Sequence, residues 1–268
     1  MSFFVMTVDV DPPIPSNPNP NIVRDGVLAL LKIFDKYTVK ATFFVPAVVA
    51  EKFPVVMDEI VKKGHEIACH GLKHDQREAT LGLEEELRII RIATETIQSV
   101  TGVKPVGFRA PLFNINENCW VALCKNGYLY DSSIVCSPFY GKHKIFFPTK
   151  PFTLPVTKTS GNCCLIEIPV STNPLFPFPL GGTYLRVFGS RWSKAGLKIN
   201  FLFRNPVVFH IHPKDVDPRT RGRVWWWYRN TRICLKMLEE IINFAQRNGA
   251  KFITAYELAI MQDKALEK

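Results

Sequence analysis

Two histidines four residues apart, His70 and His74, are the residues of this sequence best suited to chemistry. They follow the apolar run 67–69, and at this spacing two neutral imidazoles can face one point on a helix turn or a tight loop. Such a point suits a divalent metal ion, but a metal site needs further ligands. Asp9 and Asp11, at the end of the first apolar run, are the best donors, because alternate residues of a strand share one face. The sequence predicts a metal site where these two stretches meet.

The chain alternates between apolar runs of strand length and amphipathic segments of helix length. The expected strands are residues 3–8, 40–46, 65–70, 106–109, 128–131, 165–170, 206–212 and 251–254. The expected helices are residues 25–37, 51–63, 82–100, 116–126, 228–247 and 255–263. This alternation indicates an α/β fold with a parallel sheet and helices outside it. About seven or eight such units close into a barrel of the TIM type or a variant of it.

The length and composition fit one domain. The chain has 268 residues, of which 47% are hydrophobic, so we expect a single barrel over residues 1–268. Residues 136–205 are rich in Pro, Phe, Gly and Lys, and we expect them to form an insertion or lid. No apolar run approaches the roughly 18 residues needed to span a bilayer. Residues 1–6 lack a basic segment, so we expect a strand there and no signal peptide.

Cysteines and charge bear on compartment and partners. The seven cysteines, an odd number without zinc-finger spacing, predict free thiols in a reducing cytoplasm. A net charge of +10 and a pI of about 9.3 favour anionic partners. Residues 225–227 are three successive tryptophans, which cannot all be buried on one helix face, and Arg221, Arg223 and Arg229 flank them. The cluster 221–229 therefore predicts either contact with an anionic membrane surface or a homo-oligomer interface.

Ionisable side chains gather at the expected strand ends. In barrels of this kind the chemistry lies at the carboxyl ends of the strands, which meet at one rim. Five strand ends carry such residues: Asp9, Asp11, His70, His74, Arg109, Asp131, His210 and His212. We expect these side chains to form one site.

Five short motifs resemble those of the polysaccharide deacetylase family, the NodB-like carbohydrate esterases. They are Thr7-Val8-Asp9-Val10-Asp11, His70-Gly71-Leu72-Lys73-His74, Arg109-Ala110-Pro111, Asp131-Ser132-Ser133 and Ile211-His212-Pro213. The resemblance covers residues 3 to 215 in the family's order and implies a distorted (β/α) barrel. Three positions depart from the family pattern, because Val10 separates the aspartates, Gly71 replaces a hydroxyl residue, and Cys136 stands where an aromatic residue is usual. These departures concern the shape of the sugar site more than the chemistry.

The resemblance implies a hydrolase that removes N-acetyl groups from amino sugars with a divalent metal. Asp11, His70 and His74 would bind the metal, which this ligand set suggests is zinc, with cobalt or nickel as alternatives. The metal would polarise the acetyl carbonyl and activate a water, from which Asp9 would take a proton. The roles of Asp9 and Asp11 could be exchanged, because both carboxylates share one face.

The same resemblance assigns the acid to a late histidine. His212 would protonate the departing amine, and His210, two residues earlier on the same strand face, could share or take that role. Either Asp131 or Asp215 would hold the imidazole of the acid. A buried structural ion pair is the alternative role for Asp131.

Two further residues would support the reaction. Arg109 would orient Asp9 by a charge-assisted hydrogen bond, although a purely structural ion pair is an alternative here too. The backbone N–H of Leu112, which follows a proline, would join the metal in binding the acyl oxygen.

Three functions remain open from the sequence. The first is a metal-dependent amide hydrolase, a carbohydrate N-deacetylase acting on an N-acylated sugar in the cytoplasm. The second is a deformylase or deacetylase of a lipid-linked amino sugar, which would lie peripherally at the membrane. The third is a non-catalytic barrel that binds carbohydrate or polyanions, indifferent to chelators and steeply dependent on salt. Nucleic acid is not among the partners that we expect for the enzyme.

Overall fold

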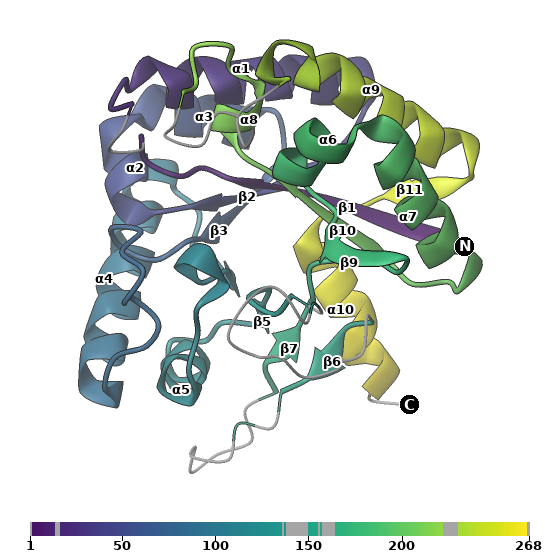
Figure 1. Cartoon of the computed structure of the whole chain (residues 1–268). Helices are drawn as coiled ribbons and strands as arrows, with labels where there is room; N and C mark the ends of the chain where they lie inside the picture. Colours follow the sequence, from purple (N-terminus) through teal and green to yellow (C-terminus); the bar gives the residue numbers. More distant parts are fainter. Residues whose placement is uncertain are drawn as a thin grey trace.

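A sheet that curls into a distorted barrel forms the centre of the molecule (Figure 1). The structure is a computed structural model that describes residues 2–13, 17–135, 137, 150–154, 156, 164–221 and 230–266. The sheet order is β10-β1-β2-β3-β4-β5-β7-β6, and β11 pairs with β1 outside this path. The strands are β1 (Ser2–Asp9), β2 (Ala41–Val45), β3 (Glu66–Cys69), β4 (Gly107–Phe108), β5 (Tyr130–Asp131), β6 (Phe152–Thr153), β7 (Ile166–Glu167), β10 (Val207–Ile211) and β11 (Ala250–Phe252).

The row from β10 to β7 contains seven parallel strands within the described residues, and β6 is antiparallel to its neighbour β7. The predicted α/β barrel of about seven strands is therefore confirmed. A short antiparallel pair, β8 (Thr172–Asn173) and β9 (Phe176–Pro179), lies between β7 and β10 in the chain. Backbone hydrogen bonds join this connection to β10, from Ser171 N–H to the Val208 carbonyl at 3.1 Å and from His210 N–H to the Leu180 carbonyl at 3.2 Å. The described part of residues 136–205 thus contributes to the barrel wall.

Helices surround this sheet (Figure 1). They are α1 (Asn21–Lys36), α2 (Ala47–Lys52), α3 (Pro54–Lys62), α4 (Leu83–Thr101), α5 (Glu117–Lys125), α6 (Gly182–Phe188), α7 (Ser190–Leu202), α8 (Pro213–Val216), α9 (Thr231–Arg247) and α10 (Ala255–Leu266), with a short 3-10 turn η1 (Pro111–Phe113). The single helix expected over 51–63 is wrong, because Pro54 cannot donate a backbone hydrogen bond and begins a new helix after α2. Helices α6 and α7 were not expected from the sequence.

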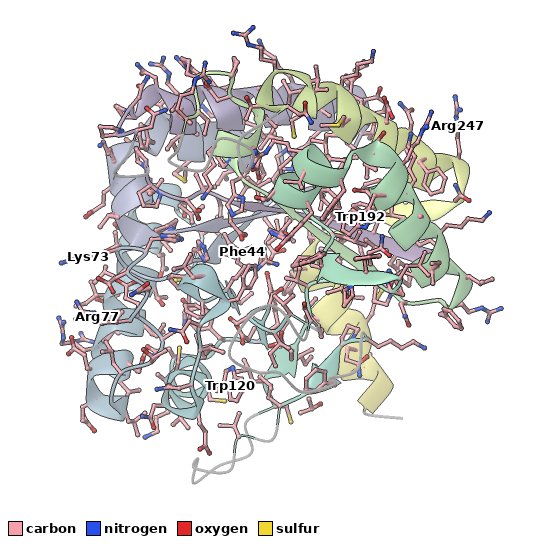
Figure 2. The ribbon with its side chains drawn as sticks, viewed as in Figure 1. Phe44, Lys73, Arg77, Trp120, Trp192 and Arg247 are labelled. Carbon is pink, nitrogen blue, oxygen red and sulfur yellow. The ribbon has the colours of Figure 1, made fainter. Side chains whose placement is uncertain are left out.

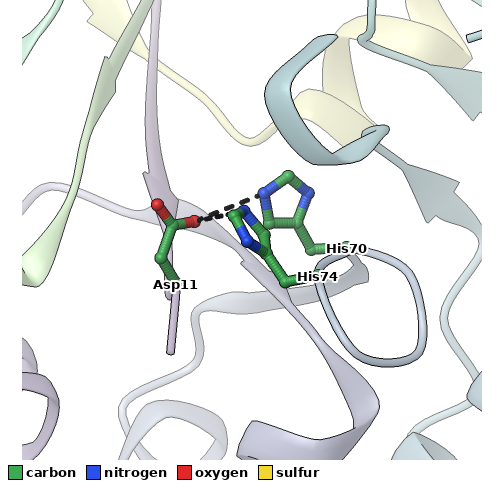
Figure 3. Close-up of side chains that lie close together, drawn as sticks. All are labelled: Asp11, His70 and His74. Atoms are coloured by element: carbon green, nitrogen blue, oxygen red, sulfur yellow. Dashed lines mark ion pairs between the residues drawn. The ribbon is translucent and has the colours of Figure 1, made fainter. Parts of the chain in front are cut away.

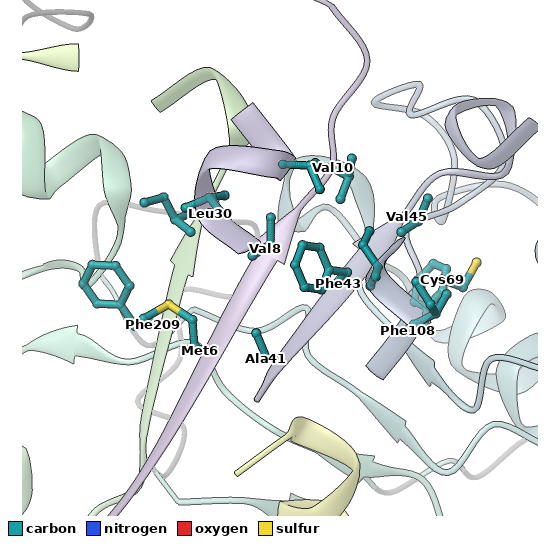
Figure 4. Close-up of a cluster of buried hydrophobic side chains, with 14 of the residues drawn as sticks. Met6, Val8, Val10, Leu30, Ala41, Phe43, Val45, Cys69, Phe108 and Phe209 are labelled. Carbon is teal, nitrogen blue, oxygen red and sulfur yellow. The ribbon is translucent and has the colours of Figure 1, made fainter. Parts of the chain in front are cut away.

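Alternate residues of β1 belong to two different cores. Met6 and Val8 pack with Leu30 of α1 and Phe43 of β2 in the larger cluster, between sheet and helices (Figure 4). Val5 belongs to a second cluster, together with Phe44, which points into the middle of the barrel (Figure 2). Because strand side chains alternate, Thr7, Asp9 and Asp11 share the inner face with Val5. The hydrophobic pattern of β1 therefore turns both aspartates toward the interior.

The cysteines and the membrane-related predictions have mixed outcomes. Cys69, Cys119, Cys164 and Cys234 are free thiols, but Cys124 is disulfide-bonded, so the expectation of free thiols throughout is wrong. Disulfides are typical of oxidising compartments, and the cysteines therefore do not support a reducing cytoplasm. In the part of the chain that the structure describes, no helix is long and apolar enough to span a membrane. Of the cluster 221–229, only Arg221 is among the described residues.

A close contact between α1 and α8 gives the first prediction. A Cβ atom at Gly26 would lie 2.5 Å from the Pro213 carbonyl oxygen and 2.7 Å from its Cβ. Alanine gains about 1 kcal/mol of helix propensity over glycine, but overpacking against a backbone atom costs about 1–3 kcal/mol. We expect Gly26→Ala to lower the free energy of unfolding, measured by urea denaturation. Gly82→Ala, where nothing lies within 4 Å, is the control and should change it by less than about 1 kcal/mol. An equal effect of both variants would contradict this packing argument.

Candidate functional site

A cavity of about 180 Å³ opens at the carboxyl ends of the barrel strands. β1 and the loop after β3 contribute one side of it, and β10, α6 and α8 contribute the other. Its lining residues are Asp9, Asp11, His70, His74, Leu112, Phe113, Thr183, Tyr184, Arg186, His210, His212 and Lys214. Six of the eight residues predicted to gather at the rim, all except Arg109 and Asp131, line this one cavity.

Asp11, His70 and His74 form a compact group (Figure 3). Their potential ligand atoms all lie within 4.8 Å of one another. The Oδ1 atom of Asp11 is 3.5 Å from Nε2 of His70 and 3.0 Å from Nε2 of His74. Burial alone would raise the pKa of Asp11, but the charges of Lys214, His212 and His74 hold it well below the usual value. The structure thus brings together the three residues that the family resemblance names as metal ligands.

The hydrogen bonds of this group fit a bound cation. Nδ1 of His70 lies 2.7 Å from the Arg109 carbonyl oxygen, an acceptor only, so Nδ1 carries the proton and Nε2 presents a lone pair. Oδ1 of Asp11 is buried and accepts no hydrogen bond within the described chain. In the neutral form of His70, two lone pairs therefore face each other, and a metal ion between them would satisfy both. One carboxylate and two imidazoles suit zinc, and also cobalt or nickel.

The loop from His70 to His74 has an unusual backbone. Gly71 has φ +80° and His74 has φ +65°, both in the left-handed region. The carboxylate of Glu78 accepts hydrogen bonds from Leu72 N–H at 3.0 Å and Lys73 N–H at 2.8 Å. A Cβ atom at Gly71 would lie 2.6 Å from Oε2 of Glu78. This contact explains why glycine stands where the family usually has a hydroxyl residue, and it shows that the pair lies on a tight loop.

Asp9 lies beside the metal group and pairs with Arg109. Nη1 of Arg109 is 2.6 Å from Oδ1 of Asp9, and both side chains are buried. The arginine also donates to Thr7 Oγ1 at 2.9 Å and to the Ser132 carbonyl at 3.0 Å, and its guanidinium lies over the Phe44 ring. Burial would raise the pKa of Asp9, but the charges of Arg109, His70, His212 and His210 together lower it. The carboxylate is therefore ionised and fixed in orientation.

His212 is held by Asp215, one of the two partners that the sequence left open. Nδ1 of His212 is 2.9 Å from Oδ2 of Asp215, and the histidine's backbone N–H donates to the same oxygen at 2.9 Å. The bond from the His212 backbone N–H to the Asp215 side chain is one half of the N-terminal capping box of α8. Nε2 of His212 faces Oδ2 of Asp11 at 3.6 Å, so the imidazole reaches the metal group.

Asp131, the other partner considered for His212, lies in a different cluster. Its carboxylate accepts hydrogen bonds from Trp120 Nε1 at 2.9 Å and from Ser133 Oγ at 2.5 Å. Burial raises the pKa of Asp131, and burial followed by the charge of Asp131 raises that of Glu167 well above its usual value. Burial therefore favours the protonated form of Glu167 in this cluster, and the hydrogen bonds of Asp131 go to Trp120 and Ser133 and not to His212.

His210 and Leu112 line the cavity at its margins. The ring centroid of His210 is 5.6 Å from that of Phe113 and 5.7 Å from that of His212. Burial lowers the pKa of His210 to about 4, so this imidazole is neutral at pH 7. Leu112 has φ +55° and is about half exposed. Leu112 lines the same cavity as Asp11, His70 and His74. The binding of the acyl oxygen by its backbone N–H stays a prediction.

Two charged residues of the cavity escaped the sequence analysis as site residues. Nζ of Lys214 lies 2.5 Å from Oδ2 of Asp11, and Arg186 lies on α6 next to Tyr184 in the lining. The place of Lys214, directly after the motif at His212, is a signal that could have identified it. Arg186 had no such signal, because it lies in a region with no expected helix.

Two family models match consecutive segments of this chain. The polysaccharide deacetylase family model matches residues 4–130, and a domain of unknown function (DUF3473) matches residues 132–245. The peptidoglycan deacetylase-like protein FGM2 of Gibberella zeae is 39% identical over 113 residues, 41% of this chain and 33% of that protein. The peptidoglycan deacetylase of Helicobacter pylori is 35% identical over 114 residues, 42% of this chain and 39% of that protein. These matches therefore span only a third to two fifths of the length of the curated relatives.

Solved structures extend the similarity of fold to nearly the whole chain. A Mycobacterium smegmatis protein assigned to the polysaccharide deacetylases matches with a TM-score of 0.71 and 23% identity over 97% of this chain and 89% of that one. The Puue allantoinase matches with a TM-score of 0.65 and 18% identity over 96% and 88% of the two chains. At these identities the likeness concerns the fold alone. The chain therefore has the NodB-like barrel fold, and its residues 4–130 match the polysaccharide deacetylase family.

Proposed function

We propose that this protein is a metal-dependent hydrolase that removes N-acetyl groups from an amino-sugar carbohydrate. The observation that carries the proposal is the arrangement of Asp11, His70 and His74 around one point, with Asp9 and His212 lining the same cavity. The match of residues 4–130 to the polysaccharide deacetylase family supports carbohydrate N-deacetylation as the reaction class. The two curated relatives are described as peptidoglycan deacetylases, which favours an N-acetylated amino sugar of a cell-wall polymer as the substrate.

The proposed mechanism assigns a proton transfer to each side of the cavity. A divalent ion held by Asp11, His70 and His74 would polarise the acetyl carbonyl and lower the pKa of a water molecule. Asp9, ionised and oriented by Arg109, takes the proton from that water as the general base.

His212 acts on the other side of the cavity. Its Nδ1–H is held by Asp215, so in the doubly protonated imidazolium Nε2 is the atom that faces the metal group and gives its proton to the departing amine, which leaves a neutral imidazole. His210, neutral and buried, shapes the pocket beside it. Leu112 is our candidate for a second hydrogen-bond donor to the acyl oxygen, because it lines the same cavity.

Metal binding should depend on the carboxylate of Asp11. We expect the wild type to bind about one zinc ion per chain by elemental analysis and titration calorimetry, and Asp11→Asn to lose most of this affinity. Zinc at 100 times its Kd should stabilise the folded wild type by about 2.7 kcal/mol and leave the variant unchanged in thermal unfolding. Asp75→Asn is the control, because Asp75 lies next to His74 in the chain but is exposed and paired with Arg77. Equal zinc binding by wild type and Asp11→Asn would rule out this ligand set.

Replacing Asp9 should lower the rate of catalysis but leave metal binding largely unchanged. We expect chelator-sensitive release of acetate from N-acetylglucosamine oligomers, and a loss of kcat of about 10²–10⁴-fold in Asp9→Asn with metal content retained. Asp25→Asn, an exposed surface variant, serves as the matched control. Metal binding without acetate release from oligomers or from peptidoglycan would discard the substrate class, and an active Asp9→Asn would exclude Asp9 as the base.

A further inference from the structure

Arg186 and Asp215 form a buried ion pair behind His212. Nη2 of Arg186 is 2.6 Å and Nε is 3.1 Å from Oδ1 of Asp215, and the two side chains are 1% and 0% exposed. The other carboxylate oxygen, Oδ2, accepts from Nδ1 and the backbone N–H of His212. One carboxylate therefore divides its two oxygens between a guanidinium and the imidazole of the proposed acid.

The ion pair keeps this carboxylate in the form that His212 needs. Burial would raise the pKa of Asp215, but the charge of Arg186, followed by that of His212, holds it far below its usual value. An ionised carboxylate is an acceptor only, so His212 keeps a proton on Nδ1 and has Nε2 available for the second proton, the one that it gives as the acid. Without Arg186, the buried Asp215 would lose most of the opposite charge that offsets the cost of burying its carboxylate. Its pKa would rise, and a protonated Asp215 would no longer fix the tautomer of the His212 imidazole.

Two glycines at the start of α6 allow this helix to pack closely against His210 and Asp215. A Cβ atom at Gly182 would lie 2.3 Å from Oδ2 of Asp215, and one at Gly181 would lie 2.4 Å from Cε1 of His210. The first turn of α6 therefore approaches the carboxylate more closely than any residue with a side chain would permit. Residues 182 and 186 are four apart on one helix, so Arg186 lies on the face that meets Asp215.

We propose that Arg186 is a positioning residue, which orients His212 through Asp215, and that the segment matching the domain of unknown function completes the acid side of the active site. Arg186, His212 and Asp215 all lie within residues 132–245, whereas Asp9, Asp11, His70 and His74 lie within 4–130. This inference rests on the proposed deacetylase function. It assigns to the second segment the acid and the groups that hold it.

The test compares two leaving groups. An N-acetyl sugar needs a proton on its departing amine, whereas 4-nitrophenyl acetate releases a phenolate that needs none. We expect Arg186→Gln to lower kcat on N-acetylglucosamine oligomers by about 10–100-fold with little change in KM, in metal content or in hydrolysis of the ester. His212→Gln should show the same selective loss, and the double variant should be no worse than His212→Gln alone.

Two variants serve as controls for charge and folding. Arg191→Gln, an exposed arginine on the neighbouring helix α7, should behave as the wild type. Arg186→Lys keeps the charge but not the two-nitrogen contact, and we expect a smaller loss in the same selective pattern. It carries the test if Arg186→Gln does not fold. Equal losses on amide and ester, or an unaffected amide reaction, would overturn the proposal.

A second measurement separates this inference from the proposed function. In NMR spectra of protein labelled with ¹⁵N-histidine, the wild type should show His212 with its proton on Nδ1, identified by the absence of the signal in His212→Gln. Arg186→Gln should lose this signal or mix the two tautomers, whether or not any substrate is hydrolysed. An unchanged spectrum would overturn the role of Arg186, and a changed spectrum without deacetylase activity would overturn only the substrate.

Discussion

The parallel register of β1, β2 and β3 is the constraint on which the site depends. Asp9 pairs with Phe44, and Phe44 with Ala68, so the ends of three strands lie level with one another. The ladder continues past the strands, since His70 N–H bonds to the Val45 carbonyl at 2.9 Å. A register slip of one residue would turn Asp9 and Asp11 toward the helices and Val10 into the cavity. Backbone hydrogen bonds therefore bring the three proposed metal ligands together.

Each side of the cavity contains a buried carboxylate whose charge is balanced by a buried arginine. Asp9 and Asp215 are both buried carboxylates, and each is paired with a buried arginine, Arg109 or Arg186, at 2.6 Å. Removing such a charge from water is costly unless an opposite charge and hydrogen bonds replace the solvent. In each pair the arginine leaves part of the carboxylate for chemistry, on one side for a water and on the other for an imidazole. One pair comes from each half of the chain, so each half supplies the counterion of its own buried carboxylate.

Sequence reasoning predicted the parts of this arrangement that depend on strand ends. The apolar runs before Asp9, His70 and His212 located the cavity residues, because carboxyl ends of parallel strands share one rim. The partner of His212 could not be chosen, since Asp131 and Asp215 both follow a strand and only packing decides between them. Helix α6 was missed because a glycine-rich start and an aromatic sequence read as loop, while its position is fixed by contact with α8. The break at Pro54 did have a local signal, a proline within the expected helix, whereas the disulfide at Cys124 depends on a partner that periodicity does not report.

Asp131 illustrates how a residue can match a catalytic motif and act at a distance from the chemistry. Its carboxylate accepts from Ser133 Oγ, and the same oxygen of Ser133 accepts from Ala110 N–H at 2.8 Å. Ala110 connects Arg109, which orients the base, to the turn that carries Leu112 into the cavity. Burial raises the pKa of both Asp131 and Glu167, which favours neutral carboxyl groups in this buried cluster. The motif at Asp131 thus fixes the backbone on which the base-side machinery rests, and the acid side is left to Asp215.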